Sequence, residues 1–145
     1  MTDITFHFNV HDRLAYSCRL LRKAYQKGAS VVLTGELQML TQLDDLLWSV
    51  SPMDFVPHCC STAPATTVAA SLVVLAPSLS GIDRSGVLIN LGQTLPAEFE
   101  RFERLIEVVT ADEQDRLAAR QRWKHYASRG YKLNQHNLAA SVNAV

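Results

Sequence analysis

Short, mostly apolar runs alternate along this chain with segments that are long enough to form helices. Three of these runs, at residues 30–34, 72–76 and 86–91, contain no charged residue. A strand that is apolar along its whole length must be covered on both faces, as in a parallel sheet between layers of helices. We therefore expect a three-layer α/β fold, with a mainly parallel sheet flanked by helices.

The ends of the predicted helices carry characteristic residues. Asp12 is a suitable N-cap for the first helix, and Gly28 and Gly130 stand where helices commonly end. Pro96 can open a short helix before the last strand. The predicted strands cover residues 5–10, 30–34, 72–76, 86–91 and 105–109, and the predicted helices cover residues 12–27, 36–48 and 112–129. We expect one domain over residues 1–138 and a frayed tail over residues 139–145.

The composition limits the classes of protein to which the chain can belong. Its 145 residues suit a single domain, 48% of them are hydrophobic, and 14 Lys and Arg are balanced by 14 Asp and Glu. Because the formal net charge is zero, a globally basic nucleic-acid-binding protein is disfavoured. The three cysteines have no C-x-x-C spacing, so neither a disulfide framework nor a zinc site is expected.

No segment has the pattern of a targeting signal or a membrane span. The N-terminus has no basic region before an apolar run, as a signal peptide would have. Residues 59–82 are uncharged, but their apolar core covers only residues 72–76, whereas a membrane span needs about 20 apolar residues. The sequence therefore predicts a soluble, cytoplasmic protein.

The expected fold is Rossmann-like, but the chain lacks the loops that bind phosphate in such folds. Gly81 and Gly86 have the glycine spacing of a phosphate-binding loop, yet Val87 and Leu88 stand where a lysine and a hydroxyl residue are needed. The segment after the first predicted strand contains no glycine, so the dinucleotide-binding motif is also missing. A turn before a strand is the better interpretation of these two glycines, and no nucleotide cofactor is expected.

Histidines and cysteines do not form a recognisable catalytic or metal-binding motif. His7, His11 and His58 are not arranged as H-E-x-x-H, and nothing near Cys59 supports a nucleophile pair. We therefore predict no catalytic residue, no metal site and no cofactor.

The last predicted helix carries a basic and aromatic face. Arg116, Arg120, Trp123 and Lys124 follow i, i+4, i+7 and i+8 spacing, which places them on one side of a helix. Val109 precedes this helix and Leu133 follows it, so both could complete an apolar pocket. Further positive charge is expected nearby from Arg122, Arg129 and Lys132.

Two interpretations of this helix face stay open from spacing alone. A surface that combines cations with an aromatic side chain suits a partner that is both acidic and apolar, because arginine forks onto carboxylates and tryptophan lines apolar pockets. Alternatively, the helix is simply a solvated basic helix whose Trp123 shields the edge of the core.

A second unusual segment, residues 47–58, is rich in aromatic residues and proline. It contains Trp48, Phe55, Pro57 and His58. An apolar loop of this kind either packs onto the sheet or forms a protein-binding patch. Composition alone slightly favours core packing of Trp48 and Phe55.

These two segments resemble the chi subunit of bacterial DNA polymerase III. The resemblance is strongest in DDLLWSVSPMDFVPH, at residues 44–58, where chi proteins carry an LW…P…FVPH pattern. It is equally clear in the run GVLINL…FERLIEVV…RLAARQRWKHYASRGYKLN, which includes the R-x-[RWY]-[YW]-K-x-Y pattern and the G-[FY]-x-L close. The combination is specific and covers most of the chain.

The resemblance implies an accessory subunit of the replisome without catalytic activity, located in the cytoplasm at the nucleoid. Chi proteins bind the psi subunit, which tethers them to the clamp loader. They also bind the acidic C-terminal tail of the single-stranded DNA-binding protein, which ends in a phenylalanine, so that their contact with DNA is indirect. The chi fold is similar to nucleotide-binding α/β domains but has no phosphate loop.

The resemblance also assigns residues to each partner by their positions in the two motifs. It places the tail-binding site at Val109, Arg116, Arg120, Trp123, Lys124 and Leu133. It places the psi interface at Trp48, Phe55, Pro57 and His58. Trp123 stands where relatives often have Tyr, and Arg116 where Lys is common. The alternative is a module that binds single-stranded nucleic acid directly through the same basic and aromatic helix.

Overall fold

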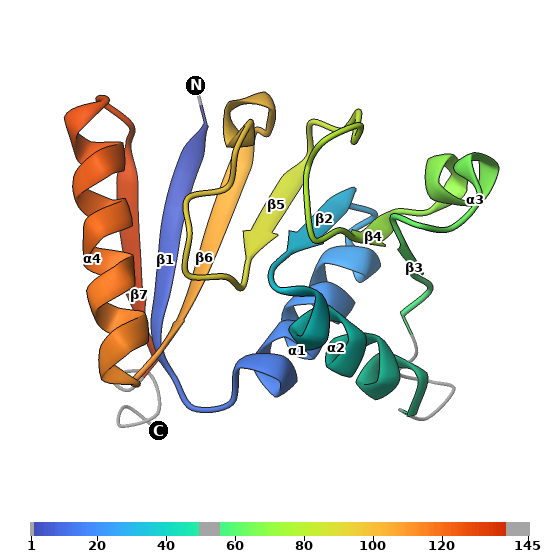
Figure 1. Cartoon of the computed structure of the whole chain (residues 1–145), viewed down its shortest axis with the longest axis horizontal. Coiled ribbons are helices and arrows are strands. Elements are labelled where there is room, and N and C mark those ends of the chain that lie inside the picture. The colour runs from blue at the N-terminus through green and yellow to red at the C-terminus, as the bar shows by residue number, and fades with distance from the viewer. Residues whose placement is uncertain (1, 50–55, 139–145) are drawn as a thin grey trace.

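A seven-stranded, all-parallel sheet forms the centre of the molecule, with strand order β3-β4-β2-β5-β6-β1-β7. The structure is a computed structural model, shown in Figure 1, and it describes residues 2–49 and 56–138. Its elements are β1 (Asp3–Val10), α1 (Arg13–Gln26), β2 (Val31–Thr34), α2 (Leu37–Ser49), β3 (Cys59–Cys60), α3 (Ala65–Ala70), β4 (Val73–Leu75), β5 (Val87–Asn90), the 3-10 turn η1 (Phe99–Arg101), β6 (Arg104–Thr110), α4 (Glu113–Ser128) and β7 (Leu133–Asn137).

Helices cover both faces of this sheet, so the predicted three-layer α/β fold is confirmed. Helices α1 and α2 pack on one face, where Leu21 and Leu43 are fully buried against strand residues such as Leu33. Helix α4 packs on the opposite face through Ala119 and Tyr126. Adjacent strand residues are therefore buried on opposite sides, which explains why the central strands have no polar face.

Three of the predicted helix-end residues agree with the structure, and one does not. The Asp12 carboxylate accepts a hydrogen bond from the Ala15 amide at 3.1 Å, as an N-cap does. Gly28 and Gly130 follow α1 and α4 with φ angles of 74° and 81°, a region that glycine adopts without strain. The predicted helix opening at Pro96 is wrong: only the 3-10 turn η1 forms there, and it begins at Phe99.

Three elements of the structure were not predicted from sequence. They are the two-residue strand β3, the short helix α3 and the edge strand β7. β7 has the sequence LNQHN, without the apolar alternation that marks a strand, and its three central residues are exposed. It forms because β1 offers a parallel partner, with Ile4 opposite Leu133 and Phe6 opposite Gln135. The predicted tail over residues 139–145 lies outside the described residues. No helix within the described part of the chain is long and apolar enough to cross a membrane.

Candidate functional site

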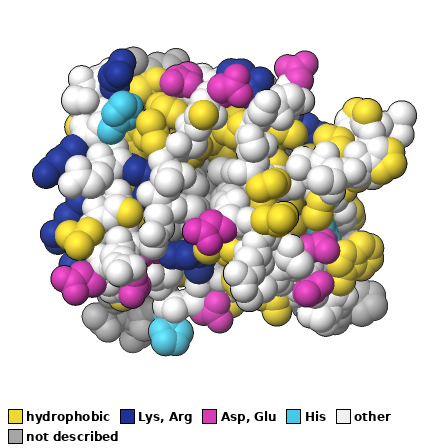
Figure 2. Space-filling model, in the orientation of Figure 1, with side chains coloured by type: hydrophobic (Ala, Val, Ile, Leu, Met, Phe, Trp, Pro, Cys, Tyr) yellow, Lys and Arg dark blue, Asp and Glu magenta, His cyan; other side chains and the backbone are white. Residues whose placement is uncertain are grey.

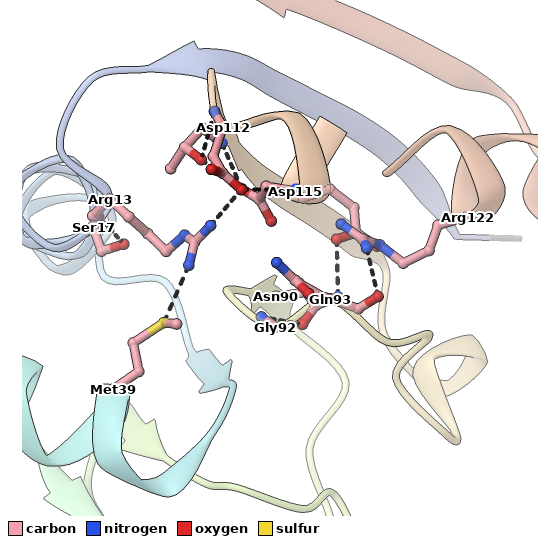
Figure 3. Close-up of polar contacts among 11 residues, drawn as sticks. Arg13, Ser17, Met39, Asn90, Gly92, Gln93, Asp112, Asp115 and Arg122 are labelled. Carbon is pink, nitrogen blue, oxygen red and sulfur yellow. Dashed lines mark hydrogen bonds and ion pairs between the residues drawn. The ribbon is translucent and has the colours of Figure 1, made fainter. Parts of the chain in front are cut away.

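The first turn of α4 is anchored to the end of β6 and to the start of α1. The carboxylate of its N-cap Asp112 accepts a hydrogen bond from the Asp115 amide at 3.2 Å. Asp115 is 1% exposed, and its carboxylate accepts from the amide and hydroxyl of Thr110 at 2.7 and 2.9 Å. The same carboxylate pairs with Arg13 of α1, and Figure 3 shows this contact. These bonds fix where the remainder of α4 lies over the sheet.

An apolar cavity of about 230 Å³ lies between α4 and the strands beside it. Phe6 and Phe8 reach it from β1, because alternate residues of a strand share a face. Trp123 forms one side and packs against Phe6, with ring centroids 5.1 Å apart. The complete lining is apolar except for two arginines and one glutamine, and it consists of Phe6, Phe8, Val109, Arg116, Ala119, Arg120, Trp123 and Gln135.

Two exposed arginines of α4 border this cavity. Arg116 and Arg120 are separated by one helical turn and contribute to the cavity wall. Figure 2 shows Lys and Arg side chains gathered on the α4 side of the molecule, with hydrophobic side chains between them. Guanidinium groups donate forked hydrogen bonds to carboxylates, so this arrangement suits a ligand with negative charge next to an apolar group.

The structure brings together four of the six residues predicted for this surface. Val109, Arg116, Arg120 and Trp123 line the cavity. Lys124 is exposed on α4 but is not among the described residues that line it. Leu133 is half-buried and packs against the hydrophobic core.

Sequence reasoning missed the part of the cavity that β1 and β7 supply. Phe6 and Phe8 alternate in the first strand, and this signal marks an apolar face without indicating its neighbours. Gln135 lies on β7, which was not predicted. Only the pairing of β1 with both β6 and β7 brings these side chains beside α4.

The expectation that Arg122 adds to the exposed charge is wrong. Arg122 is 3% exposed and points to the sheet, where its Nε donates to the Glu107 carboxylate at 3.1 Å. Its Nη1 donates to the Gln93 carbonyl at 2.8 Å, and this contact is visible in Figure 3. The Tyr126 hydroxyl and the Asn90 amide also donate to Glu107, at 2.6 and 2.9 Å. A buried carboxylate on β6 thus draws one arginine of α4 into the core.

Burial governs the ionisation of this cluster. It raises the pKa of Glu107, while the neighbouring Arg122 and the hydrogen bonds from Tyr126, Arg122 and Asn90 act against that rise. It also raises the pKa of Tyr126, and the nearby Glu107 carboxylate adds to the effect. The Tyr126 hydroxyl therefore keeps its proton and acts as a donor to Glu107. None of these groups lines the α4 cavity, so the role of the cluster at that site is to hold α4 in place.

Comparison with known proteins decides the family. The family described as DNA polymerase III chi subunit, HolC, matches residues 1–134. This chain belongs to the DNA polymerase III chi subunit family. DNA polymerase III subunit chi of Pseudomonas aeruginosa is 32% identical over 127 residues, which cover 87% of each chain. DNA polymerase III subunit chi of Haemophilus influenzae is 28% identical over 123 residues, or 84% of this chain and 85% of the relative. The family is an accessory subunit of a replicative polymerase and not its catalytic subunit.

The other segment that resembles chi proteins lies at the far end of the sheet from α4. Trp48, near the end of α2, is 63% exposed, so core packing is wrong for this residue. Its ring lies beside that of His58, with centroids 5.5 Å apart. Two hydrogen bonds hold the His58 ring in place: its Nε2 lies 2.8 Å from the Asp44 carboxylate, and its Nδ1 lies 2.7 Å from the Val56 carbonyl oxygen. Pro57 is exposed, and Phe55 lies outside the described residues.

A second cavity, of about 440 Å³, opens at the carboxyl ends of β4, β2 and β5. Parallel α/β folds often bind nucleotides at this edge of the sheet. However, none of the described residues that line it is Lys or Arg, and Glu36 adds negative charge. Gly86, one of the two glycines with the spacing of a phosphate-binding loop, has a packing role, because a Cβ there would lie 2.4 Å from the Ser30 carbonyl oxygen. Among the described residues, this chi family member therefore offers no cationic group in this cavity to hold a phosphate.

Metal ligation also finds no support within the part of the chain that the structure describes. No three His, Cys, Asp or Glu side chains there lie close enough to hold an ion. The His7 ring bonds to the Tyr16 hydroxyl. Cys18, Cys59 and Cys60 are free thiols.

Proposed function

We propose that this chain links a clamp loader to single-stranded DNA that is coated by its binding protein. In this role the α4 cavity takes the acidic C-terminal tail of the single-stranded DNA-binding protein. The surface around Trp48 takes the psi subunit, which tethers the chain to the clamp loader. DNA is contacted only indirectly, and the chain performs no chemistry of its own.

The apolar cavity bordered by Arg116 and Arg120 is the observation that carries this proposal. A tail that ends in an acidic run and a phenylalanine presents an aromatic ring beside several carboxylates. The ring would be buried against Phe6 and Trp123, which removes apolar surface from water. The carboxylates would receive charge-assisted hydrogen bonds from the two arginines, and these bonds are stronger than neutral ones.

The surface at Trp48 supports the second half of the proposal. Exposed tryptophans are enriched among the residues that dominate protein–protein binding energy. Here the indole is not alone, since His58 lies against it and is itself fixed by Asp44. A tryptophan whose neighbour is already ordered loses less conformational entropy when a partner binds.

Titration with a tail peptide tests the tail-binding site directly. We expect the wild-type chain to bind the peptide, and Arg120→Ala to bind it roughly tenfold or more weakly, because a charge-assisted contact is lost. Arg19→Ala is the matched control, since it removes the same charge from an exposed position on α1, across the sheet. Equal affinities of the two variants would remove Arg120 from the site. Raised salt should weaken wild-type binding, because part of the attraction is screened.

A single-stranded oligonucleotide in the same titration tests the alternative, direct nucleic-acid binding. The basic helix favours that function, but Trp123 is half-buried and packs against Phe6, which leaves less of the indole for base stacking. The zero net charge also argues against it. If the chain binds the oligonucleotide but not the peptide, the arginines of α4 would be assigned to direct nucleic-acid binding instead.

A further inference from the structure

Strand β7 forms the outer edge of the sheet at the end where α4 lies (Figure 1). Within the described residues it pairs only with β1. Natural edge strands are commonly protected by lysine, proline or a bulge, but β7 has the sequence LNQHN and continuous register with β1. Its central residues, Asn134, Gln135 and His136, are all exposed. An edge of this kind can accept another extended chain.

The direction of each backbone group in β7 follows from one backbone hydrogen bond between β1 and the residue before β7. The Ile4 amide donates to the Lys132 carbonyl at 3.2 Å, so the backbone of residue 132 points toward β1. Backbone groups of successive residues alternate between the two sides of a strand. Asn134 and His136 therefore also point inward, whereas the amide and carbonyl of Gln135 point outward. No other described residue bonds to these outward groups of Gln135.

Gln135 joins this open edge to the α4 cavity. Its side chain lines the cavity, while its backbone faces away from β1. A residue placed opposite Gln135 on an added strand would direct its side chain to the same face of the sheet, toward α4. The exposed Lys132 precedes the edge, Arg116 and Arg120 border the cavity, and β7 itself contains no acidic residue. The chemistry of the edge thus matches an extended, acidic peptide.

We infer that the acidic tail binds by strand addition. Its backbone exchanges hydrogen bonds with the outward amide and carbonyl of Gln135, while its apolar side chain enters the α4 cavity. This inference rests on the proposed function, because it concerns how the same ligand is held. Strand addition lets main-chain bonds supply affinity while a pocket supplies specificity. It also holds the tail straight, so that its carboxylates pass Arg116 and Arg120.

Peptides methylated at single backbone amides test this mode on the wild-type chain. An N-methyl group removes one donor and blocks the approach of a neighbouring strand at that position. We expect alternating behaviour: methylation at every second position weakens binding roughly tenfold, and methylation at the positions between them has little effect. Equal affinity of all the peptides, or losses without alternation, would overturn strand addition. Failure of the unmodified peptide to bind would instead overturn the proposed function.

Two substitutions at Gln135 test the same idea from the protein side. Gln135→Ala removes the side chain and keeps the backbone amide. Gln135→Pro also removes the amide, which points away from β1, so the ladder with β1 keeps its bonds. We expect the proline variant to bind the unmodified peptide severalfold more weakly than the alanine variant, with melting temperature as the check on folding. Equal binding by two folded variants would contradict the inference, and if the proline variant is unfolded the methylated peptides decide.

Discussion

Two arginines of α4, Arg120 and Arg122, are only two positions apart but lie in opposite environments. Arg120 is exposed and borders the apolar cavity, whereas Arg122 is 3% exposed and bonds to Glu107. Two positions along a helix turn through about 200°, so their side chains must leave on opposite sides. What differs is the surface that each side meets: solvent on one side and a buried carboxylate of β6 on the other. The comparison teaches that a cation on a helix indicates an exposed face only when no buried anion lies beneath.

The largest expected effect comes from removing the buried member of this pair. We predict that Arg122→Ala lowers the free energy of unfolding by about 3–5 kcal/mol, because Glu107 is left buried without its partner. Chemical denaturation measures this loss. Arg120→Ala is the matched control and should change stability by less than about 0.5 kcal/mol, as surface substitutions usually do. Similar stabilities of the two variants would contradict the conclusion that Arg122 stabilises the core and Arg120 does not.

A double variant sharpens the same comparison. Arg122→Met with Glu107→Gln removes both charges while keeping side chains of similar size. Replacing a whole buried ion pair is far less costly than removing one partner, so this variant should be clearly more stable than Arg122→Ala. The reverse order would mean that the charge of Glu107 is not what holds Arg122 in the core.

The surface around Trp48 should show an effect on binding alone. We predict that Trp48→Ala weakens binding to the psi subunit by about 2 kcal/mol, or roughly thirtyfold, as loss of a dominant interface tryptophan does. Since Trp48 is 63% exposed, the free energy of unfolding should change little. Calorimetric titration of the wild type and the variant with psi measures the difference. The exposed Leu117→Ala on α4 is the control, and an equal loss of psi binding in both variants would contradict the assignment.

The effect that is smallest near neutral pH extends the contrast between buried and exposed residues to the histidines of the N-terminal region. Burial, aided by the nearby His136, Arg104 and Lys23, lowers the pKa of His7 from 6.5 to about 4. The unfolded chain therefore binds more protons than the folded chain between pH 6.5 and 4, so His7 makes the protein less stable as the pH falls through that window. In His7→Asn this part of the pH dependence of unfolding should disappear.

Denaturation at several pH values between 4 and 7 checks the His7 prediction. His11→Asn, which changes an exposed histidine, is the matched control. If His7→Asn keeps the full wild-type slope, another group causes the acid sensitivity.

Sequence patterns predicted most of the scaffold because they report local requirements. The apolar runs at β2, β4 and β5 are buried on both faces, and Asp12 caps α1 as its position suggested. Apolar alternation did not predict β7, because an edge strand with exposed residues does not need an apolar side chain at every second position. The preference of proline for the first position of a helix wrongly predicted a helix at Pro96, because a suitable first residue does not supply the packing that a full helix needs.

The candidate site was likewise predicted only in part from the sequence. Helical spacing alone grouped Arg116, Arg120 and Trp123, and all three border the cavity. Spacing also suggested Lys124, which is exposed on α4 but is not among the described residues that line the cavity. The apolar wall from Phe6 and Phe8 could not be predicted, since β1 pairs with strands that lie about a hundred residues further along the chain.

The sequence by itself determined which segments form the central buried strands, where α1, α2 and α4 lie and which family the motifs resemble. These properties depend on neighbours within one strand or one helical turn, and the period of each element relates them directly to residue order. The tertiary structure alone decided that Arg122 is buried while Arg120 is exposed, and that Gln135 joins an open edge to a cavity. Those outcomes depend on long-range pairing of β1, β6 and β7, which sets the groups beneath α4 and has no local signature.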